Sequence, residues 1–246
     1  MNDKVLVIMP VYNKQEFLEN SIKSVLNQTH KNLLLCIVDD CSTDSSLSIA
    51  NRYAKKDSRV SVFSNSKNSG CYRTRNKGLH ENSNKDWDFF TIHDSDDTSN
   101  KERISYSLKF FCDPNLMGLK STYNRINLEG KPQMCELNKD KVDTYSSEGI
   151  AFFRRSAFDQ LGYYDDTRFS GDTDYWWRLE HFCHYNPPFK VASCLKPMYQ
   201  ALSHNNNLTK IYTFEKDRPE YFEKCQKDLI QNMIPLRNFY RKVILG

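Results

Sequence analysis

The sequence predicts an α/β fold: a doubly wound, mostly parallel, Rossmann-like sheet with a helical extension at the C-terminus. Two observations indicate this class. Continuous apolar runs, typical of strands that are buried on both faces, occur at 5–9, 33–38 and 89–92. Apolar residues between these runs recur at helical spacing, so strands and helices alternate along the chain, as they do in parallel sheets.

The elements of the first half follow in a regular order. Pro10 ends the first strand, Asn13 is available to cap the next helix, and Thr43 or Asp44 is available to cap the one after it. In chain order the prediction gives strand 5–9, helix 15–27, strand 33–38, a helix through Tyr53, strand 60–63, a helix starting near Tyr72 and strand 89–92.

The second half gives a looser pattern. The prediction there is a helical face over 104–111, strands at 117–123 and 148–155, a helix opened by Asp172, strand 190–195, a polar loop at 198–207 and a helix over 217–246. We therefore expect one domain over 1–210, with halves at 1–100 and 101–210, and a helical tail at 211–246.

Composition narrows the function. The chain has 246 residues, a net charge of +4 and 39% hydrophobic residues, which is ordinary for a globular protein. No run of Lys and Arg marks a nucleic-acid partner, and no stretch has the length of a membrane span or a signal peptide. The eight cysteines show no zinc spacing. A cytoplasmic protein is expected. Its basic tail contacts an anionic membrane, another protein or its own domain.

Three carboxylates lie within four positions directly after the strand 89–92, namely Asp94, Asp96 and Asp97. Strand ends of open α/β sheets are the usual ligand sites. A divalent cation relieves the repulsion of crowded carboxylates, and Mg²⁺ typically takes one or two of them together with substrate phosphate. The segment is therefore either a metal site for a diphosphate or a polar turn that caps the next helix.

The order of motifs resembles the family 2 glycosyltransferases, which use nucleotide sugars and have the GT-A fold. The motifs are Met9 to Asn13, Ser24 to Thr29, Val38 to Asp44, Asn68 to Gly70 with Arg75 to Leu79, and Asp94 to Asp97, and the resemblance resumes over 148–182. The Asp-x-Asp signature of the family falls on Asp94 and Asp96, with Asp97 beside it.

This resemblance implies roles for several residues. Asp96 and Asp97 are the implied ligands of Mn²⁺ or Mg²⁺, and His204 either joins the metal or diphosphate or is simply exposed. Asp94 orients water, ribose or sugar hydroxyls. Asp40 reads the imide N–H of uracil or thymine, with Asp39 supporting the loop, unless the pair only caps a helix.

The resemblance also assigns the remaining donor-site residues. Tyr12 stacks on the base or only packs, and Pro10 supplies backbone contacts. Arg75 pairs with phosphate or with Asp94, and Arg73 is a second candidate for the phosphate.

The catalytic residue implied by the resemblance is Asp172, the general base of inverting members. This sequence has Gly171 where many relatives have Glu. Asp174 is the competing carboxylate, and Asp172 alternatively caps its helix. Trp176 and Trp177 either line the acceptor site or pack.

The function expected from these residues is an inverting transfer of sugar from a UDP-sugar or dTDP-sugar to an acceptor hydroxyl, such as that of a glycan. The resemblance implies that the half 1–100 binds the nucleotide and the half 101–210 binds the acceptor. The alternative is an inactive GT-A module that binds nucleotide or serves as a scaffold. A receiver-like signalling domain would explain Asp39 and Asp40 but not the acid cluster or the stretch 148–179.

Overall fold

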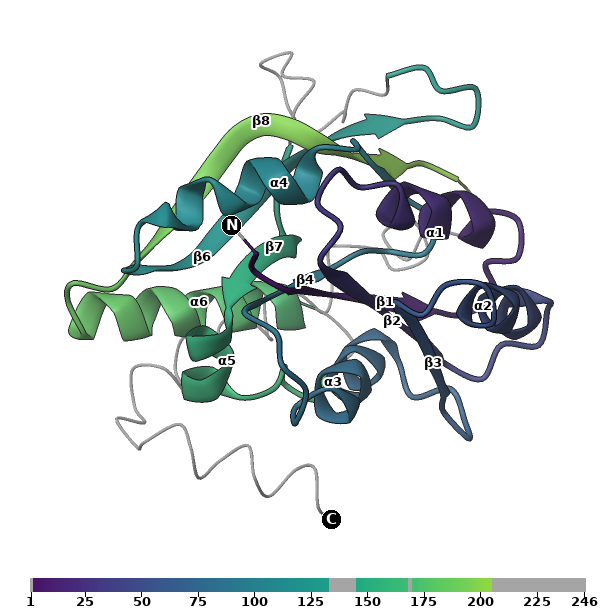
Figure 1. Ribbon diagram of the computed structural model, residues 1–246, viewed down its shortest axis with the longest axis horizontal. Coiled ribbons are helices and arrows are strands. Elements are labelled where there is room, and N and C mark those ends of the chain that lie inside the picture. Colours follow the sequence, from purple (N-terminus) through teal and green to yellow (C-terminus); the bar gives the residue numbers. More distant parts are fainter. Residues whose placement is uncertain (1, 133–144, 168–169, 205–246) are drawn as a thin grey trace, which may run out of the picture.

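The computed structural model describes residues 2–132, 145–167 and 170–204, and Figure 1 shows their arrangement. An eight-stranded mixed sheet runs through the molecule in the order β3-β2-β1-β4-β7-β6-β8-β5. The predicted doubly wound α/β class is confirmed.

The first half of the sheet is parallel. It contains β1 (Val5–Val11), β2 (Leu33–Asp39), β3 (Val60–Ser64) and β4 (Phe89–Ile92). Between these strands lie α1 (Leu18–Leu26), α2 (Ser46–Ala54) and α3 (Cys71–Glu81). Because β1 pairs in parallel with both β2 and β4, the carboxyl ends of these strands meet at one edge of the sheet, called here the carboxyl edge.

The second half of the sheet mixes directions. It contains β5 (Thr98–Ser99), β6 (Leu116–Ile126), β7 (Tyr145–Arg154) and β8 (Lys190–Leu202). Its helices are α4 (Arg103–Leu108), the short 3-10 helix η1 (Phe110–Cys112), α5 (Arg155–Leu161) and α6 (Gly171–Tyr185). Strand β7 lies antiparallel between β4 and β6, whereas β6 and β8 are parallel.

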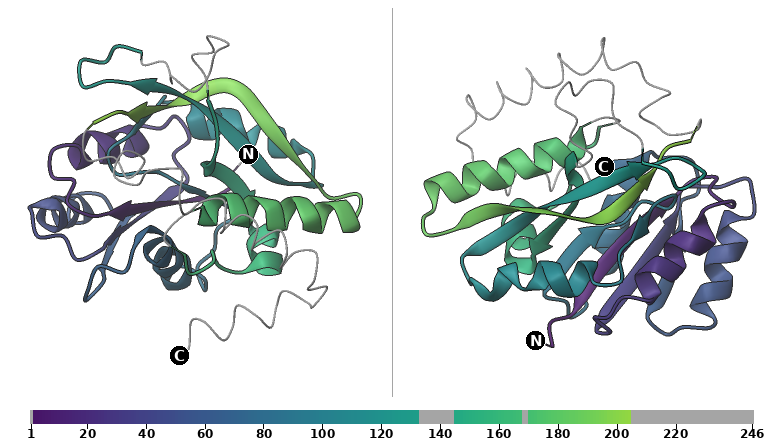
Figure 2. Two further views of the ribbon diagram at one scale, coloured as in Figure 1. Left: turned by 180° about the vertical axis from the view of Figure 1, so that it is seen from behind. Right: turned by 90° about the horizontal axis from the view of Figure 1, so that it is seen from above.

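Helices cover both faces of the sheet (Figure 2), and an apolar core lies between the helices and the sheet on each face. On β1, Val5, Val7 and Met9 face the core that contains α1, α2 and α4. Leu6 and Ile8 face the core that contains α3, α5 and α6. This alternation explains why β1 is apolar without interruption: both of its faces are covered by helices.

A glycine sets the close approach of α3 to the sheet. A Cβ at Gly78 would lie 2.7 Å from the Cγ2 atom of Ile8, well inside van der Waals contact. Helix α3 therefore packs tightly on β1, which holds the residues of its first turns at the carboxyl edge.

Several local predictions need correction. Strand β8 does not end at residue 195 but continues to Leu202, because it stays paired with β6 up to Ile126. Asn13 caps no helix: it adopts a positive φ of 51°, and its side chain accepts a hydrogen bond from the Thr43 amide. The end of the proposed domain at 210 and the predicted helix at 217–246 lie outside the described residues.

Candidate active site

The carboxyl edge gathers the predicted donor-site residues. The Asp40 amide donates to the Val11 carbonyl over 2.7 Å, and the His93 amide donates to the Ile8 carbonyl over 2.9 Å. These bonds extend the parallel ladders by one residue beyond β2 and β4. Tyr12, Asp40 and Asp94 consequently leave three neighbouring strands at the same edge.

Asp40 is buried and anchors the start of α3. Its Oδ1 atom accepts hydrogen bonds from the Ser69 amide and the Asn65 side chain, and its Oδ2 atom accepts one from the Gly70 amide, each over 2.8 Å. A carboxylate at this place also interacts favourably with the positive end of the α3 dipole. Asp40 thus supports a loop, the task predicted for its neighbour, and its role in reading a base stays a prediction.

Asp39 supports a different loop. Its Oδ2 atom accepts a hydrogen bond from the Ser42 amide over 3.1 Å. Its Oδ1 atom is buried and has no hydrogen-bond partner among the described residues. Neither Asp39 nor Asp40 is the N-cap of α2, which is Ser45.

Tyr12 follows β1 with 45% of its surface exposed, in contrast to the buried residues of that strand. Pro10 lies within β1 and is only partly buried. An exposed aromatic ring beside a ligand edge is suited to stacking, so the predicted stacking of Tyr12 on a base stays open.

Asp96 is the centre of an ionic cluster. Its Oδ2 atom lies 2.6 Å from Lys14 Nζ and 2.9 Å from His204 Nε2. The His204 ring stacks on Phe17, with 4.6 Å between the ring centroids. The structure therefore brings two of the predicted metal ligands, Asp96 and His204, into contact, and adds a lysine that sequence reasoning missed.

Asp97 points into the fold. Its Oδ1 atom accepts a hydrogen bond of 2.8 Å from the Leu202 amide, which ties the acid cluster to the end of β8. Burial, together with the charges of Asp96 and Asp94, raises the pKa of Asp97 well above its usual range. Asp97 is thus tied to the backbone of β8, whereas Asp96 meets an imidazole, so Asp96 is the better placed of the two for a metal.

The described residues contain no group of three or more His, Cys, Asp or Glu side chains arranged to hold a metal. Asp96 and His204 form a pair of potential ligands. A pair fits an ion that keeps water and substrate phosphate in its remaining positions, as Mg²⁺ does.

Arg75 is a buried cation on α3, and the protein satisfies only part of its hydrogen-bonding capacity. Its Nη2 atom lies 3.4 Å from Asp94 Oδ1, while its Nε and Nη1 atoms are buried without a hydrogen-bond partner in the described part of the chain. The rings of Tyr72 and Tyr164 lie beside the guanidinium, with centroids 5.1 and 5.8 Å away. The second candidate, Arg73, pairs instead with Asp166 at the surface.

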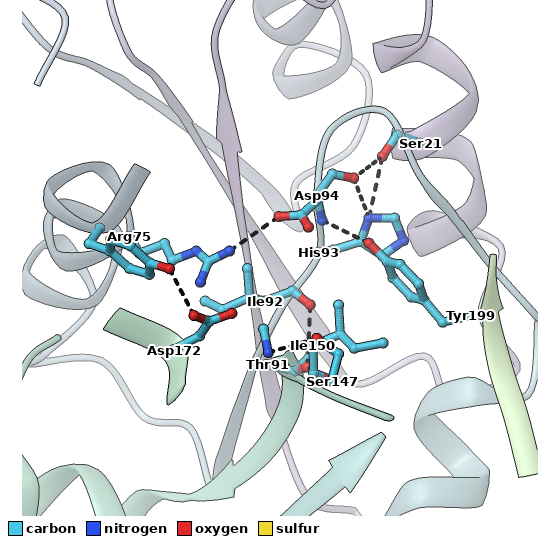
Figure 3. A network of polar contacts seen from close by, with 12 residues as sticks. Ser21, Arg75, Thr91, Ile92, His93, Asp94, Ser147, Ile150, Asp172 and Tyr199 are labelled. Atoms are coloured by element: carbon cyan, nitrogen blue, oxygen red, sulfur yellow. Dashed lines mark hydrogen bonds and ion pairs between the residues drawn. The ribbon is translucent and has the colours of Figure 1, made fainter. Parts of the chain in front are cut away.

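Asp172 lies in the first turn of α6 and completes the site, as Figure 3 shows together with Arg75 and Asp94. Its Oδ1 atom accepts hydrogen bonds from the Tyr72 hydroxyl over 2.8 Å and from the Thr173 amide over 3.1 Å. The N-cap of α6 is Ser170, so Asp172 does not cap its helix.

The competing carboxylate, Asp174, is not on the helix surface. It is buried and forms an ion pair of 2.9 Å with Arg178. Trp176 is also buried and donates to Glu180, so packing is confirmed for this tryptophan.

Beyond Lys14, sequence reasoning missed Tyr72 and Tyr199. The Tyr199 hydroxyl accepts a hydrogen bond of 2.9 Å from the Asp94 amide. Tyr72 is three positions before Arg75 and so shares its helix face, which is a signal that the sequence did contain. Lys14 lies two positions after Tyr12, at the same strand end, so the sequence held a signal for it too. Tyr199 reaches the site only through the pairing of β8, for which the sequence holds no local signal.

A family model described as Glycosyl transferase family 2 matches residues 6–162. The chain therefore belongs to this family, and the resemblance found in the sequence motifs is confirmed. Within the part of the chain that the structure describes, none of the helices has the length and apolar character needed to cross a membrane.

Curated relatives match about half of the chain. An uncharacterized glycosyltransferase of Haemophilus influenzae is 34% identical over 139 residues, which are 56% of this chain and 54% of the relative. The putative teichuronic acid biosynthesis glycosyltransferase TuaG of Bacillus subtilis is 34% identical over 128 residues, 52% of this chain and 50% of the relative. The chain thus spans about half the length of these two proteins.

Solved structures share the fold over nearly the whole chain. The structure of S. aureus TarS in complex with UDP-GlcNAc superposes with a TM-score of 0.71 and 22% identity, over 92% of this chain and 65% of that one. The mannosyltransferase PcManGT from Pyrobaculum calidifontis, in complex with GDP-Man and Mn²⁺, gives a TM-score of 0.61 at 14% identity, over 99% of this chain and 65% of that one. At these identities the likeness shows the GT-A fold.

Proposed function

We propose that this protein is an inverting, metal-dependent glycosyltransferase that moves a sugar from a uridine or thymidine diphosphate sugar to a hydroxyl group of a glycan acceptor. The observation that carries the proposal is the environment of Arg75. A guanidinium is always charged, and burying it with open donors is costly unless an anion completes it. The diphosphate of a nucleotide sugar is such an anion.

The donor pocket is assigned to the carboxyl edge. Tyr12 stacks on the base, Pro10 supplies backbone contacts, and Asp40 accepts the imide N–H of uracil or thymine. The Oδ2 atom of Asp40 accepts a hydrogen bond from the Gly70 amide and, as a carboxylate oxygen, keeps capacity to accept this second bond. The complexes of TarS with UDP-GlcNAc and with UDP favour a uridine donor.

The metal is assigned to Asp96 and His204, and Asp97 remains a further candidate ligand. An ion held by these residues would supply Lewis-acid stabilisation of the negative charge that develops on the departing diphosphate. Asp94 orients donor hydroxyls or water and keeps Arg75 in place. The Mn²⁺ in the PcManGT complex supports a divalent ion in this fold.

Asp172 acts as the general base. The acceptor oxygen forms a bond to the anomeric carbon while the bond from that carbon to the phosphate oxygen breaks, and its electron pair leaves with the diphosphate. The hydroxyl proton passes to the Asp172 carboxylate. A single in-line displacement of this kind inverts the anomeric configuration.

Binding and turnover test the proposal separately. UDP is expected to raise the melting temperature far more with Mn²⁺ than with EDTA, because ligand binding stabilises the folded state by mass action. Release of UDP is then measured with a panel of UDP-glucose, UDP-galactose and UDP-GlcNAc. Metal-dependent binding without turnover in the presence of acceptor glycans would instead support an inactive nucleotide-binding module, and equal shifts with and without metal would refute the metal assignment.

A further inference from the structure

Tyr72 touches the carboxylate of Asp172 but has no part in the chemistry described above. It lies in the first turn of α3 and is only 7% exposed, and its hydroxyl donates to Asp172 Oδ1 over 2.8 Å. Burial and the charge of Asp172 raise the pKa of Tyr72 well above its usual range, so the phenol remains a proton donor at any pH at which the protein works.

The carboxylate of Asp172 is held from two sides. Both of its hydrogen bonds among the described residues, from Tyr72 and from the Thr173 amide, reach the Oδ1 atom. The Oδ2 atom lies against β7, only 2.8 Å from the position that a Cβ at Gly149 would take. The glycine leaves room for Oδ2, and the two donors fix which oxygen remains available to accept a proton.

The ring of Tyr72 also accounts for the glycine before the base. A Cβ at Gly171 would lie 2.9 Å from Cδ1 and 3.0 Å from Cγ of Tyr72. The ring therefore fills the space into which any side chain at position 171 would project. The packing of the Tyr72 ring against the start of α6 therefore depends on Gly171.

Tyr72 further connects the two halves of the site. Its ring lies 5.1 Å from the guanidinium carbon of Arg75, while its hydroxyl contacts Asp172. One side chain thus places the cation that faces the diphosphate and the carboxylate that faces the acceptor.

We propose that Tyr72 is the positioning residue of the general base: its hydrogen bond to Oδ1 orients Asp172 so that Oδ2 receives the acceptor proton. The inference rests on the proposed role of Asp172. The base lies on α6, and the side chain that positions it comes from a neighbouring helix, α3.

Tyr72→Phe tests the proposal, because it removes the hydroxyl and keeps the ring that packs on Gly171 and Arg75. The turnover number for release of UDP, measured with Mn²⁺ and the UDP-sugar that the wild-type protein turns over fastest, is expected to fall about 10-fold, as for a hydrogen bond to a charged group. The affinity for UDP by isothermal titration and the melting temperature are expected to remain those of the wild type. Loss confined to the turnover number is a result that a merely structural role does not give.

Tyr53→Phe is the matched control. The Tyr53 hydroxyl also lies at hydrogen-bond distance from a carboxylate, that of Glu19 at 3.2 Å, but this pair joins α2 to α1 and has no contact with Asp172, so its removal is expected to leave the turnover number unchanged. Gly149→Ala is a second, independent variant, because its Cβ displaces Oδ2 from the opposite side. It is expected to lower the turnover number without weakening UDP binding.

Asp172→Asn, measured in parallel, separates the two levels of the proposal. If Asp172→Asn is inactive while Tyr72→Phe and Gly149→Ala turn over like the wild type, the positioning role is wrong and the base assignment stands. If Asp172→Asn is fully active, the base assignment fails, and the role of Tyr72 fails with it. If both new variants lose turnover at wild-type UDP affinity and Asp172→Asn is inactive, the proposal is supported.

Discussion

His204 Nε2 lies 2.9 Å from Asp96 Oδ2, although 108 positions separate the two residues in the sequence. The end of β8 thus delivers an imidazole to the carboxylate that follows β4. Asp97 belongs to the same acid cluster, yet it is bonded to the backbone of Leu202. These different surroundings allow the candidate metal ligands to be separated by experiment.

The first prediction concerns the metal. We expect the affinity for Mn²⁺ to fall by at least about 10-fold in Asp96→Asn and in His204→Gln, because even the loss of a residue that only supports a metal ligand has an effect of this size. Titration of Mn²⁺ by electron paramagnetic resonance in the presence of UDP measures this affinity. Asp97→Asn is the control, and its affinity is expected to stay close to that of the wild type. Weaker Mn²⁺ binding in Asp97→Asn, with unchanged binding in Asp96→Asn, would assign the metal to Asp97 instead.

The second prediction concerns Lys14, whose ammonium lies 2.6 Å from the same Asp96 oxygen. Both side chains are largely buried, with 17% and 12% exposed, so their attraction is only partly screened. A cation that binds Asp96 has to displace this ammonium. Lys14→Met is therefore expected to strengthen Mn²⁺ binding by about fivefold, which corresponds to ~1 kcal/mol for an ion pair near the surface.

The same spectroscopic titration measures the effect of Lys14→Met, with Lys31→Met as a control for the general loss of one positive charge. Unchanged or weaker Mn²⁺ binding in Lys14→Met would mean that the lysine does not compete with the metal.

The extent of sequence-based prediction differs between the two halves of the site. Apolar and strand-forming residues predicted the strands at 5–9, 33–38 and 89–92. The geometry of parallel strands then predicted that Tyr12, Asp40 and Asp94 converge at one edge of the sheet. The antiparallel insertion of β7 between β4 and β6 had no local signal, because the pairing depends on residues that are distant in the chain. Strand β8 was predicted too short for a related reason: Lys196 and Pro197 interrupt its apolar run, and its last part is recognised only from its pairing with β6.

Individual roles within the site were harder to predict than its location. The buried ion pair of Asp174 with Arg178 is an i, i+4 contact, which the sequence contained, yet burial of that helix face was not apparent from it. Asp39 and Asp40 both support loops, and the support by Asp40 depends on loop 65–70 folding back onto it, a contact for which adjacent positions in a sequence hold no signal.

The third prediction concerns Asp40. Asp40→Asn replaces an acceptor with an amide that presents a donor to the imide N–H, and UDP binding is expected to weaken by ~1–3 kcal/mol. Isothermal titration of UDP measures the change. Because Asp40 also holds loop 65–70, Asn65→Ala is the matched control: it removes one loop contact and leaves the Asp40 charge in place. Equal losses in the two variants would trace the effect to the loop, and an unaffected Asp40→Asn would locate the nucleotide elsewhere.

The last prediction separates catalysis from binding at the start of α6. Asp172→Asn retains the shape of the side chain and an oxygen for the Tyr72 hydrogen bond but cannot take the acceptor proton. Its turnover number is expected to fall by ~10²-fold or more, with nearly unchanged affinity for the UDP-sugar. Nuclear magnetic resonance of the product should show inverted configuration at the anomeric carbon.

Asp174→Asn is the contrasting variant two positions further along. It breaks the buried pair with Arg178 and is expected to cost ~3–5 kcal/mol of stability, since it leaves a buried cation uncompensated. Its folded fraction should nevertheless turn over like the wild type, because Asp174 faces the core and not the site. Denaturant unfolding should therefore find Asp174→Asn to be the less stable variant, whereas steady-state kinetics should find Asp172→Asn to be the less active one. A retained anomeric configuration, or an Asp172→Asn protein as active as the wild type, would remove Asp172 from the role of base, and loss of turnover in fully folded Asp174→Asn would transfer that role to Asp174.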